Sequence, residues 1–270
     1  MASHCSLRAG GLAQDFFSPN NIQELVEFLS TNTQPILFIG LGSNLLVRDQ
    51  GFKGVAIKLT KLKSINITQD SLYAEAGTTL AKLSRVVSEH GLFGAEFLSA
   101  IPGTLGGALA MNAGAFNAEI WPFVNSVRTI NSSGEVFTRY SQDFKIGYRQ
   151  VIANHKNEYF ISAEMSFNSK HANQDIKQLL TARNASQPIG LPSCGSVFKN
   201  PKHRYAAELI EKSGLKGFCI GGACVSDKHA NFIINNNNAS AGDIESLILH
   251  IQQVVKLNFK IDLETELKII

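Results

Sequence analysis

The stretch AEFLSAIPGTLGGALAMNAGAF, Ala95–Phe116, decides how this chain folds. It gathers glycine and alanine into one segment, with glycines at 103, 106, 107 and 114. One explanation is close packing of a helix against a sheet. However, a run such as IPGTLGG costs much chain entropy on folding. A backbone that closes around a flat, extended ligand accounts for the composition better, and at this point both interpretations stay open.

A second glycine-rich segment, FIGLGSNLLVRD, lies upstream at Phe38–Asp49. Its glycines would let backbone N–H groups turn toward an anion without a clash of Cβ atoms. It lacks the third glycine and the following helix of a Rossmann fingerprint, and it lacks the Gly-Lys-Ser/Thr of a P-loop. A plain tight turn is the alternative to a phosphate site. Two such segments in one domain predict a large dinucleotide rather than a single phosphate.

Hydrophobic periodicity around these segments predicts an α+β chain without regular βαβ alternation. The predicted helices cover 22–30 (capped by Asn21), 79–91, 174–185, 205–213 and a long final helix from Ser240. The predicted strands cover 35–40, 54–59, 160–167, a hairpin of 124–130 with 135–140, and the C-terminal KIDLETELKII. The sequence has no fixed-period repeat.

Composition excludes several classes of function. The 270 residues are 44% hydrophobic and 17% charged, enough for a core in two or three subdomains. A net charge of +3 without a basic run argues against nucleic acid as partner. No apolar run is long enough for a membrane span, and the first residues lack the apolar region of a signal peptide. We therefore expect a soluble cytoplasmic protein that acts on small molecules, whose oligomeric state the sequence does not give.

The four cysteines, at 5, 194, 219 and 224, form no CxxC pair. Cys219 and Cys224 lie in an apolar, glycine-rich stretch. We expect buried free thiols there, rather than a disulfide or a metal site, and we expect no metal elsewhere in the chain.

Six motifs, in order along most of the chain, together resemble the MurB family, the UDP-N-acetylenolpyruvoylglucosamine reductases. They are GLGSNLLVRDQGFKGVAIKL, GLFGAEFLSAIPGTLGGALAMNAGAFNAEI, GYR at Gly147–Arg149, PSCGSVFKNP at Pro192–Pro201, GLKGFCIGGACVSDKHANFIIN at Gly214–Asn235, and LETEL near the C-terminus. One glycine-rich match would be weak evidence, whereas six in the family's order are specific.

The resemblance implies an α+β fold with an FAD-binding domain of the PCMH/vanillyl-alcohol-oxidase type over residues 1–168, in subdomains of about 1–58 and 59–168. A smaller α/β substrate-binding domain would follow at 169–270. The chain looks like the compact, type II form. The implied activity is NADPH-dependent reduction of UDP-N-acetyl-enolpyruvoylglucosamine to UDP-N-acetylmuramate, a step of peptidoglycan precursor synthesis.

The family's cofactor segments imply a set of FAD contacts in this sequence. They are Gly40, Gly42, Ser43, Asn44, Leu45, Pro102, Gly103, Thr104, Gly106, Gly107, Asn112 and Gly114. Lys199 and Asn200 suit the UDP moiety of the substrate, because a cation and an amide match pyrophosphate and sugar oxygens.

The implied chemistry assigns three catalytic residues. A hydride goes to C3 of the enolpyruvyl group, the carbanion or enolate at C2 needs stabilisation, and a positioned acid protonates C2. By family analogy Ser196 is the proton donor, and Arg149 and Glu266 flank the substrate carboxylate. Glu264 competes with Glu266 for this role, and the position before Leu267-Lys268 favours Glu266. We expect His229 to be structural or to support the site indirectly.

The sequence departs from the family pattern at three places. Gln150 and Val151 follow Tyr148-Arg149 where a Ser is usual at the second position, Cys5 replaces an early Thr, and Asn117 replaces a Gly. None removes a proposed catalytic group. The rival hypotheses are another flavin enzyme of the same fold and a non-catalytic flavin- or nucleotide-binding protein, neither of which needs Arg149, Ser196 and Glu266.

Overall fold

The computed structural model describes residues 1–68, 71–167 and 175–270. The chain divides into two compact units, each made of separate stretches of sequence. The sheet unit comprises Asp15–Leu41 and Gly54–Ala182, and the C-terminal unit comprises Met1–Gln14, Gly42–Lys53 and Arg183–Ile270. The predicted domains were continuous, whereas here two N-terminal stretches group with the C-terminal part. The predicted boundary at 168/169 lies outside the described residues.

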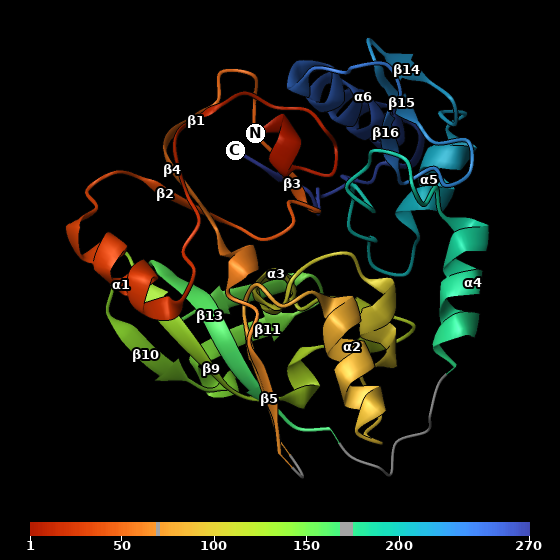
Figure 1. The fold of residues 1–270 in the computed structure, drawn as a ribbon. Helices are drawn as coiled ribbons and strands as arrows, with labels where there is room; N and C mark the ends of the chain where they lie inside the picture. The colour runs from red at the N-terminus through yellow and green to blue at the C-terminus, as the bar shows by residue number, and fades with distance from the viewer. Residues whose placement is uncertain (69–70, 168–174) are drawn as a thin grey trace. The chain divides into compact units, whose positions relative to one another are not determined.

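A five-stranded sheet forms the centre of the sheet unit (Figure 1). Its strands, in spatial order, are β10 (Val136–Arg139), β9 (Val124–Asn131), β13 (Glu158–Met165), β6 (Leu72–Glu75) and β5 (Ile65–Ile67). All neighbours are antiparallel. The hairpin predicted from the NSSG turn is confirmed, with Val136 opposite Ile130.

Both faces of this sheet are buried. On one face pack α2 (Leu80–Glu89), the short helix η3 (Glu96–Ala100) and α3 (Leu105–Met111), in one apolar cluster with sheet residues such as Val127. Sheet residues such as Ile130 belong to a second cluster, with α1 (Ile22–Thr31), β4 (Phe52–Lys58) and the partly buried β2 (Ile36–Ile39). β2 and β4 run parallel in a three-stranded sheet completed by β1 (Ala13–Phe17).

Three predicted helix starts are confirmed by their caps. The side chain of Asn21 accepts a hydrogen bond from Glu24 N at 2.8 Å, and Thr79 caps α2 in the same way. Ser240 and Asp243 form a full capping box at α6 (Ala241–Phe259). These caps satisfy backbone N–H groups that have no partner within the helix. α4 (Ile176–Ser186) has no buried side chain.

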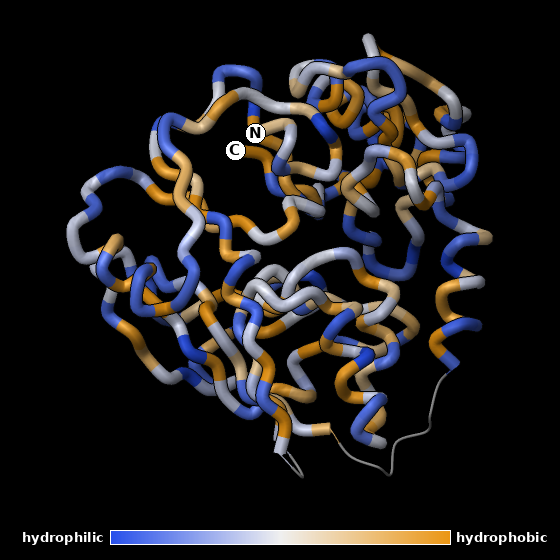
Figure 2. The backbone as a smooth tube through the Cα atoms, in the orientation of Figure 1, coloured by the Kyte–Doolittle hydropathy of each residue, from blue (hydrophilic) through white to orange (hydrophobic). Residues whose placement is uncertain are grey.

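The C-terminal unit is built around α6 and α5 (Ala206–Lys212), with the antiparallel strands β14 (Cys219–Ile220), β15 (Ala223–Val225) and β16 (Ile233–Asn235). Apolar residues recur along α6 with the helical period (Figure 2) and join one core cluster. The predicted C-terminal strand is much shorter than expected: only β17 (Lys268–Ile269) forms, parallel to β3 (Leu45–Leu46). Among the described helices, none combines the length and apolar character that a bilayer crossing requires.

The prediction of free thiols at Cys219 and Cys224 is wrong, because the two form a disulfide. The residues lie directly opposite each other in the β14–β15 pair, with Cα atoms 4.1 Å apart. Gly221 and Gly222 form the turn that brings them face to face, and no CxxC spacing signals this cross-strand pairing. Cys5 and Cys194 are buried and take no part in this disulfide.

Candidate active site

A cavity of about 300 Å³ lies in the sheet unit. Backbone and small side chains form part of its wall and aromatic side chains another part. The lining residues are Phe38, Ile39, Gly40, Leu59, Ala76, Thr104, Gly106, Gly107, Ala110, Phe144, Val151, Ala153, Glu158, Tyr159 and Phe160. Four predicted FAD contacts are among them. Such a combination of close backbone and aromatic rings suits a flat ring system.

The glycines of this cavity separate the packing explanation from the ligand explanation. A Cβ on Gly40 would overlap the Thr104 hydroxyl, and one on Gly106 would lie 2.9 Å from Cβ of Ala76. These two glycines are therefore required by internal packing. A Cβ on Gly107 would meet only Thr104 Oγ1, at 3.9 Å, and Gly107 is exposed. Internal packing does not explain Gly107, whose lack of a side chain keeps the cavity open.

The predicted phosphate segment is divided between the two units, after Leu41. Gly42 is buried with φ +68°, and a Cβ there would overlap the carbonyl of His4. Internal packing thus explains Gly42 as well. Asn44 donates from Nδ2 to the carbonyl of Glu266 at 3.0 Å, and Leu45 is buried in β3. Ser43 is half-buried beside them.

Arg149 lies in the sheet unit, in the two-residue turn between β11 (Phe144–Gly147) and β12 (Gln150–Ala153). Its guanidinium donates to the carbonyls of Asn112 at 3.4 Å and Gly114 at 2.6 Å. Asn112 is 1% exposed, and its carboxamide donates to Glu119 Oε2 at 2.8 Å and to the carbonyl of Gly147 at 3.2 Å. The side chain of Asn112, predicted as an FAD contact, is thus used inside the protein.

Ser196 and Glu266 come together in the C-terminal unit. Glu266 N donates to the carbonyl of Val197 at 2.8 Å, and Phe198 pairs with Thr265 in an antiparallel bridge. Both predicted catalytic side chains are half-buried. Among the described residues, no hydrogen bond involves the Ser196 hydroxyl. This pairing fixes the two residues on adjacent extended segments.

The same pairing distinguishes the two candidate acids. Glu264 is 71% exposed in its side chain and forms an ion pair with Lys199 at 2.6 Å. The negative charge of Glu266, by contrast, adds to the effect of burial in raising the pKa of the Cys194 thiol. Glu266 is thus the half-buried one of the two carboxylates.

Lys199 and Asn200, predicted as substrate contacts, each have a partner within the protein. Lys199 pairs with Glu264, and Asn200 Oδ1 accepts from Ala206 N at 3.0 Å, at the start of α5. Their contact with the substrate stays a prediction.

Sequence reasoning missed Asn231, in the SDKHAN motif. Its Oδ1 accepts from Phe198 N at 3.0 Å, its Nδ2 donates to Phe198 O at 2.8 Å, and its carbonyl accepts from Val197 N. His229 Nδ1 accepts from Asn231 N at 3.2 Å, and burial lowers the pKa of His229. His229 thus supports this motif, in line with its predicted structural role. The residue type was the one signal in the sequence for this role, because a buried Asn must satisfy four hydrogen-bonding positions.

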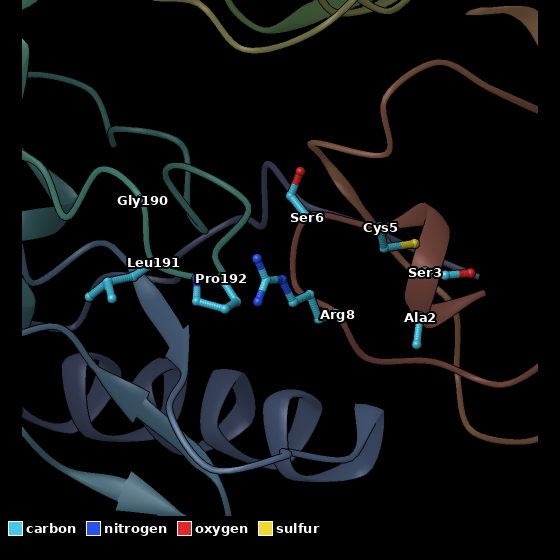
Figure 3. Close-up of a pocket in the computed structure, with 8 residues that line it drawn as sticks. All are labelled: Ala2, Ser3, Cys5, Ser6, Arg8, Gly190, Leu191 and Pro192. Carbon is cyan, nitrogen blue, oxygen red and sulfur yellow. The ribbon is translucent and has the colours of Figure 1, made fainter.

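A second cavity, of about 520 Å³, lies in the C-terminal unit (Figure 3). It is lined by Ala2, Ser3, Cys5, Ser6, Arg8, Gly190, Leu191 and Pro192. Figure 3 shows the Arg8 side chain extending toward Pro192, which lies four residues before Ser196. A guanidinium and two hydroxyls in one cavity suit an anionic group. None of these residues was predicted as a site residue. No group of three metal-ligating side chains occurs among residues 1–68, 71–167 and 175–270.

Comparison with known proteins matches two family models to this chain. A model described as an FAD binding domain matches residues 17–139, and one described as the C-terminal domain of UDP-N-acetylenolpyruvoylglucosamine reductase matches residues 187–270. The first range contains most of the lining of the sheet-unit cavity, and the second contains Ser196 and Glu266.

Curated relatives match over the whole chain. UDP-N-acetylenolpyruvoylglucosamine reductases from Methylococcus capsulatus and Nitrosococcus oceani are 45% and 44% identical, over 100% of this chain and 91% and 93% of their own length. The crystal structure of UDP-N-acetylenolpyruvylglucosamine reductase from Thermus caldophilus covers 99% of this chain and 96% of its own, with a TM-score of 0.81 at 28% identity.

Proposed function

Because the chain belongs to the UDP-N-acetylenolpyruvoylglucosamine reductase (MurB) family, we propose that Arg149, Ser196 and Glu266 carry out its reaction. The enzyme is a UDP-N-acetylmuramate dehydrogenase of peptidoglycan precursor synthesis, which uses FAD and NADPH. Its substrate is UDP-N-acetylenolpyruvoylglucosamine.

The sheet-unit cavity fits part of the cofactor. FAD, when bound and reduced by NADPH, would supply the hydride for C3 of the enolpyruvyl group. Gly107 and the neighbouring cavity wall would hold a ring system of FAD, since a side chain at this position would point into the space that the ring needs. Phe38, Tyr159 and Phe160 would pack against it. The volume is enough for a part of this dinucleotide, not for all of it.

Three side chains would then act on the substrate. The guanidinium of Arg149 is always charged and binds a carboxylate in a planar, two-point fashion, so it would stabilise the enolate that forms when C3 gains a hydride. The Ser196 hydroxyl would give its proton to C2 and would regain a proton from water or a neighbouring group. Glu266 would flank the substrate carboxylate together with Arg149, on the segment that pairs with the one carrying Ser196.

The observation that carries this assignment is the hydrogen bond from Glu266 N to Val197 O at 2.8 Å. It places the carboxylate and the hydroxyl on neighbouring segments of one unit.

Purified protein tests the proposal directly. Its FAD should be reduced by NADPH without air and then reoxidised on addition of UDP-N-acetylenolpyruvoylglucosamine. Arg149→Ala, Ser196→Ala and Glu266→Ala should each slow reoxidation strongly. If all three variants reoxidise like the wild type, the assignment is wrong. Rapid reoxidation by oxygen with none by the substrate would favour another flavin enzyme of the same fold.

A further inference from the structure

The turn that carries Arg149 has a strained backbone. Arg149 has φ +52°, in the left-handed region that favours glycine. A residue held there is strained and persists only where its surroundings fix it. The residues that hold this turn therefore matter for the position of the guanidinium.

Asn112 holds the turn at two points. Its carboxamide donates to the carbonyl of Gly147, the residue at which β11 ends, and its own backbone carbonyl accepts from Arg149 Nη1. Asn112 itself has φ +43° and ends α3 as its C-cap. One buried residue thus connects the end of a helix, the start of the turn and the guanidinium.

Glu119 orients the carboxamide of Asn112. Glu119 Oε2 accepts from Asn112 Nδ2 at 2.8 Å, and Glu119 pairs with Gly114 across the strands β7 (Gly114–Ala115) and β8 (Ala118–Glu119). A Cβ on Gly114 would lie 3.0 Å from Glu119 Cγ and 3.2 Å from Arg149 Nη1. Glu119 and Arg149 therefore both approach the position that a side chain of Gly114 would occupy, and the Gly114 carbonyl accepts from Arg149.

We propose that Asn112 and Glu119 are positioning residues for Arg149. Glu119 fixes the Asn112 carboxamide, and Asn112 fixes both the strained turn and the guanidinium that meets the substrate carboxylate. This inference rests on the role proposed above for Arg149. It also gives Asn112 a task different from the FAD contact predicted from the sequence.

The first test removes the Glu119 carboxylate. Glu119→Ala should slow reoxidation of the reduced enzyme by the substrate on the order of 10- to 100-fold, because a displaced catalytic group loses that much. Reduction by NADPH and the FAD content per chain should stay at the wild-type level. Glu119→Gln keeps an acceptor for Asn112 and should recover most of the rate. Glu135→Ala is the matched control, because Glu135 accepts from Asn131 Nδ2 at 2.7 Å in the exposed turn between β9 and β10.

The second test exchanges the two partners. Asn112→Asp alone places a carboxylate against Glu119 and should slow reoxidation, while Asp still tolerates the left-handed backbone. Combined with Glu119→Gln, the hydrogen bond between residues 112 and 119 forms again with donor and acceptor exchanged, whereas the hydrogen bond to the Gly147 carbonyl stays lost, so the rescue is partial. The double variant should therefore reoxidise faster than Asn112→Asp alone, a rescue that general damage to the fold would not show.

A double-mutant cycle with Arg149→Ala decides whether Glu119 acts through Arg149. In that background Glu119→Ala should add little further loss in rate, and little further loss in substrate affinity measured by calorimetry on the oxidised holoenzyme. Equal losses in both backgrounds would overturn the inference, as would a wild-type rate for Glu119→Ala. If Arg149→Ala itself reoxidises normally, the role proposed for Arg149 fails instead.

Discussion

Asn231 and Phe198 are joined by two hydrogen bonds between one carboxamide and both polar groups of one backbone residue. Asn231 is 4% exposed and Phe198 is 1% exposed, so neither backbone group has water as an alternative partner. The segment that begins with Ser196 is thereby fixed two residues beyond the hydroxyl. The position of the Ser196 segment therefore depends on this buried pair.

Asn231→Ala should lower the free energy of unfolding by about 2–4 kcal/mol, because two buried backbone groups lose their partners. Chemical denaturation measures this. Asn125→Ala is the control, since Asn125 makes an exposed hydrogen bond to Ser166 and its loss should change stability by less than about 0.5 kcal/mol. Equal stability of the two variants would contradict the structural role of Asn231.

Adjacent glycines of the IPGTLGG segment should fail in different ways. Gly106→Ala should lower the melting temperature, because its Cβ would press against Ala76. Gly107→Val should fold normally and lose FAD, because its side chain would enter the cavity. Bound FAD per chain and the melting temperature of the apoprotein distinguish the two. A Gly107→Val variant with full FAD would return this position to the packing explanation.

Cys194 should make stability fall at alkaline pH. Burial, with a contribution from the charge of Glu266, raises the pKa of Cys194 from 9.0 to about 12. Between these values the unfolded chain releases the thiol proton and the folded chain keeps it, so unfolding becomes more favourable as pH rises. The contribution is about 1.4 kcal/mol per pH unit above pH 9.

Denaturation of the wild type and of Cys194→Ala at pH 8, 9 and 10 measures this effect. The stability difference between the two should shrink as pH rises. A constant difference would mean that the pKa of the thiol is the same in the folded and the unfolded protein. Cys194→Ala should also keep the rate of substrate reduction, since the Cys194 thiol is buried and Ser196 is the proposed proton donor.

The Cys219–Cys224 disulfide should contribute about 2 kcal/mol to stability, the chain-entropy value for a loop this short. A reducing agent should therefore lower the free energy of unfolding of the wild type by about this amount. The variant Cys219→Ser/Cys224→Ser should be insensitive to the reductant. If the wild type is equally insensitive, the disulfide is absent in solution.

Local signals predicted much of the fold. The caps at Asn21, Thr79 and Ser240 arise from side chains that accept from nearby backbone N–H groups. The donor and the acceptor of such a contact lie only a few residues apart in the sequence. The C-terminal strand was overestimated, because LETEL pairs through a single bridge at Thr265 whose partner lies far away in sequence. The grouping of Gly42–Lys53 with the C-terminal part has the same origin, in pairings such as β3 with β17.

The candidate residues were predicted from motifs, whereas the residues that form hydrogen bonds around them were not. Asn44, Glu119 and Asn231 act through hydrogen bonds to Glu266, Asn112 and Phe198, and the bonds made by Asn44 and Asn231 join residues far apart in the chain. A single sequence does not show such pairs. The disulfide was missed because it depends on strand register rather than on a CxxC spacing.

The role of Ser196 is the central claim, and anaerobic stopped-flow on Ser196→Ala tests it most directly. Reduction of bound FAD by NADPH needs no proton at C2 and should proceed at nearly the wild-type rate. Reoxidation by UDP-N-acetylenolpyruvoylglucosamine should slow by roughly 10²–10⁴-fold, the usual cost of losing a positioned general acid. If the two rates fall equally, or if neither falls, Ser196 is not the proton donor.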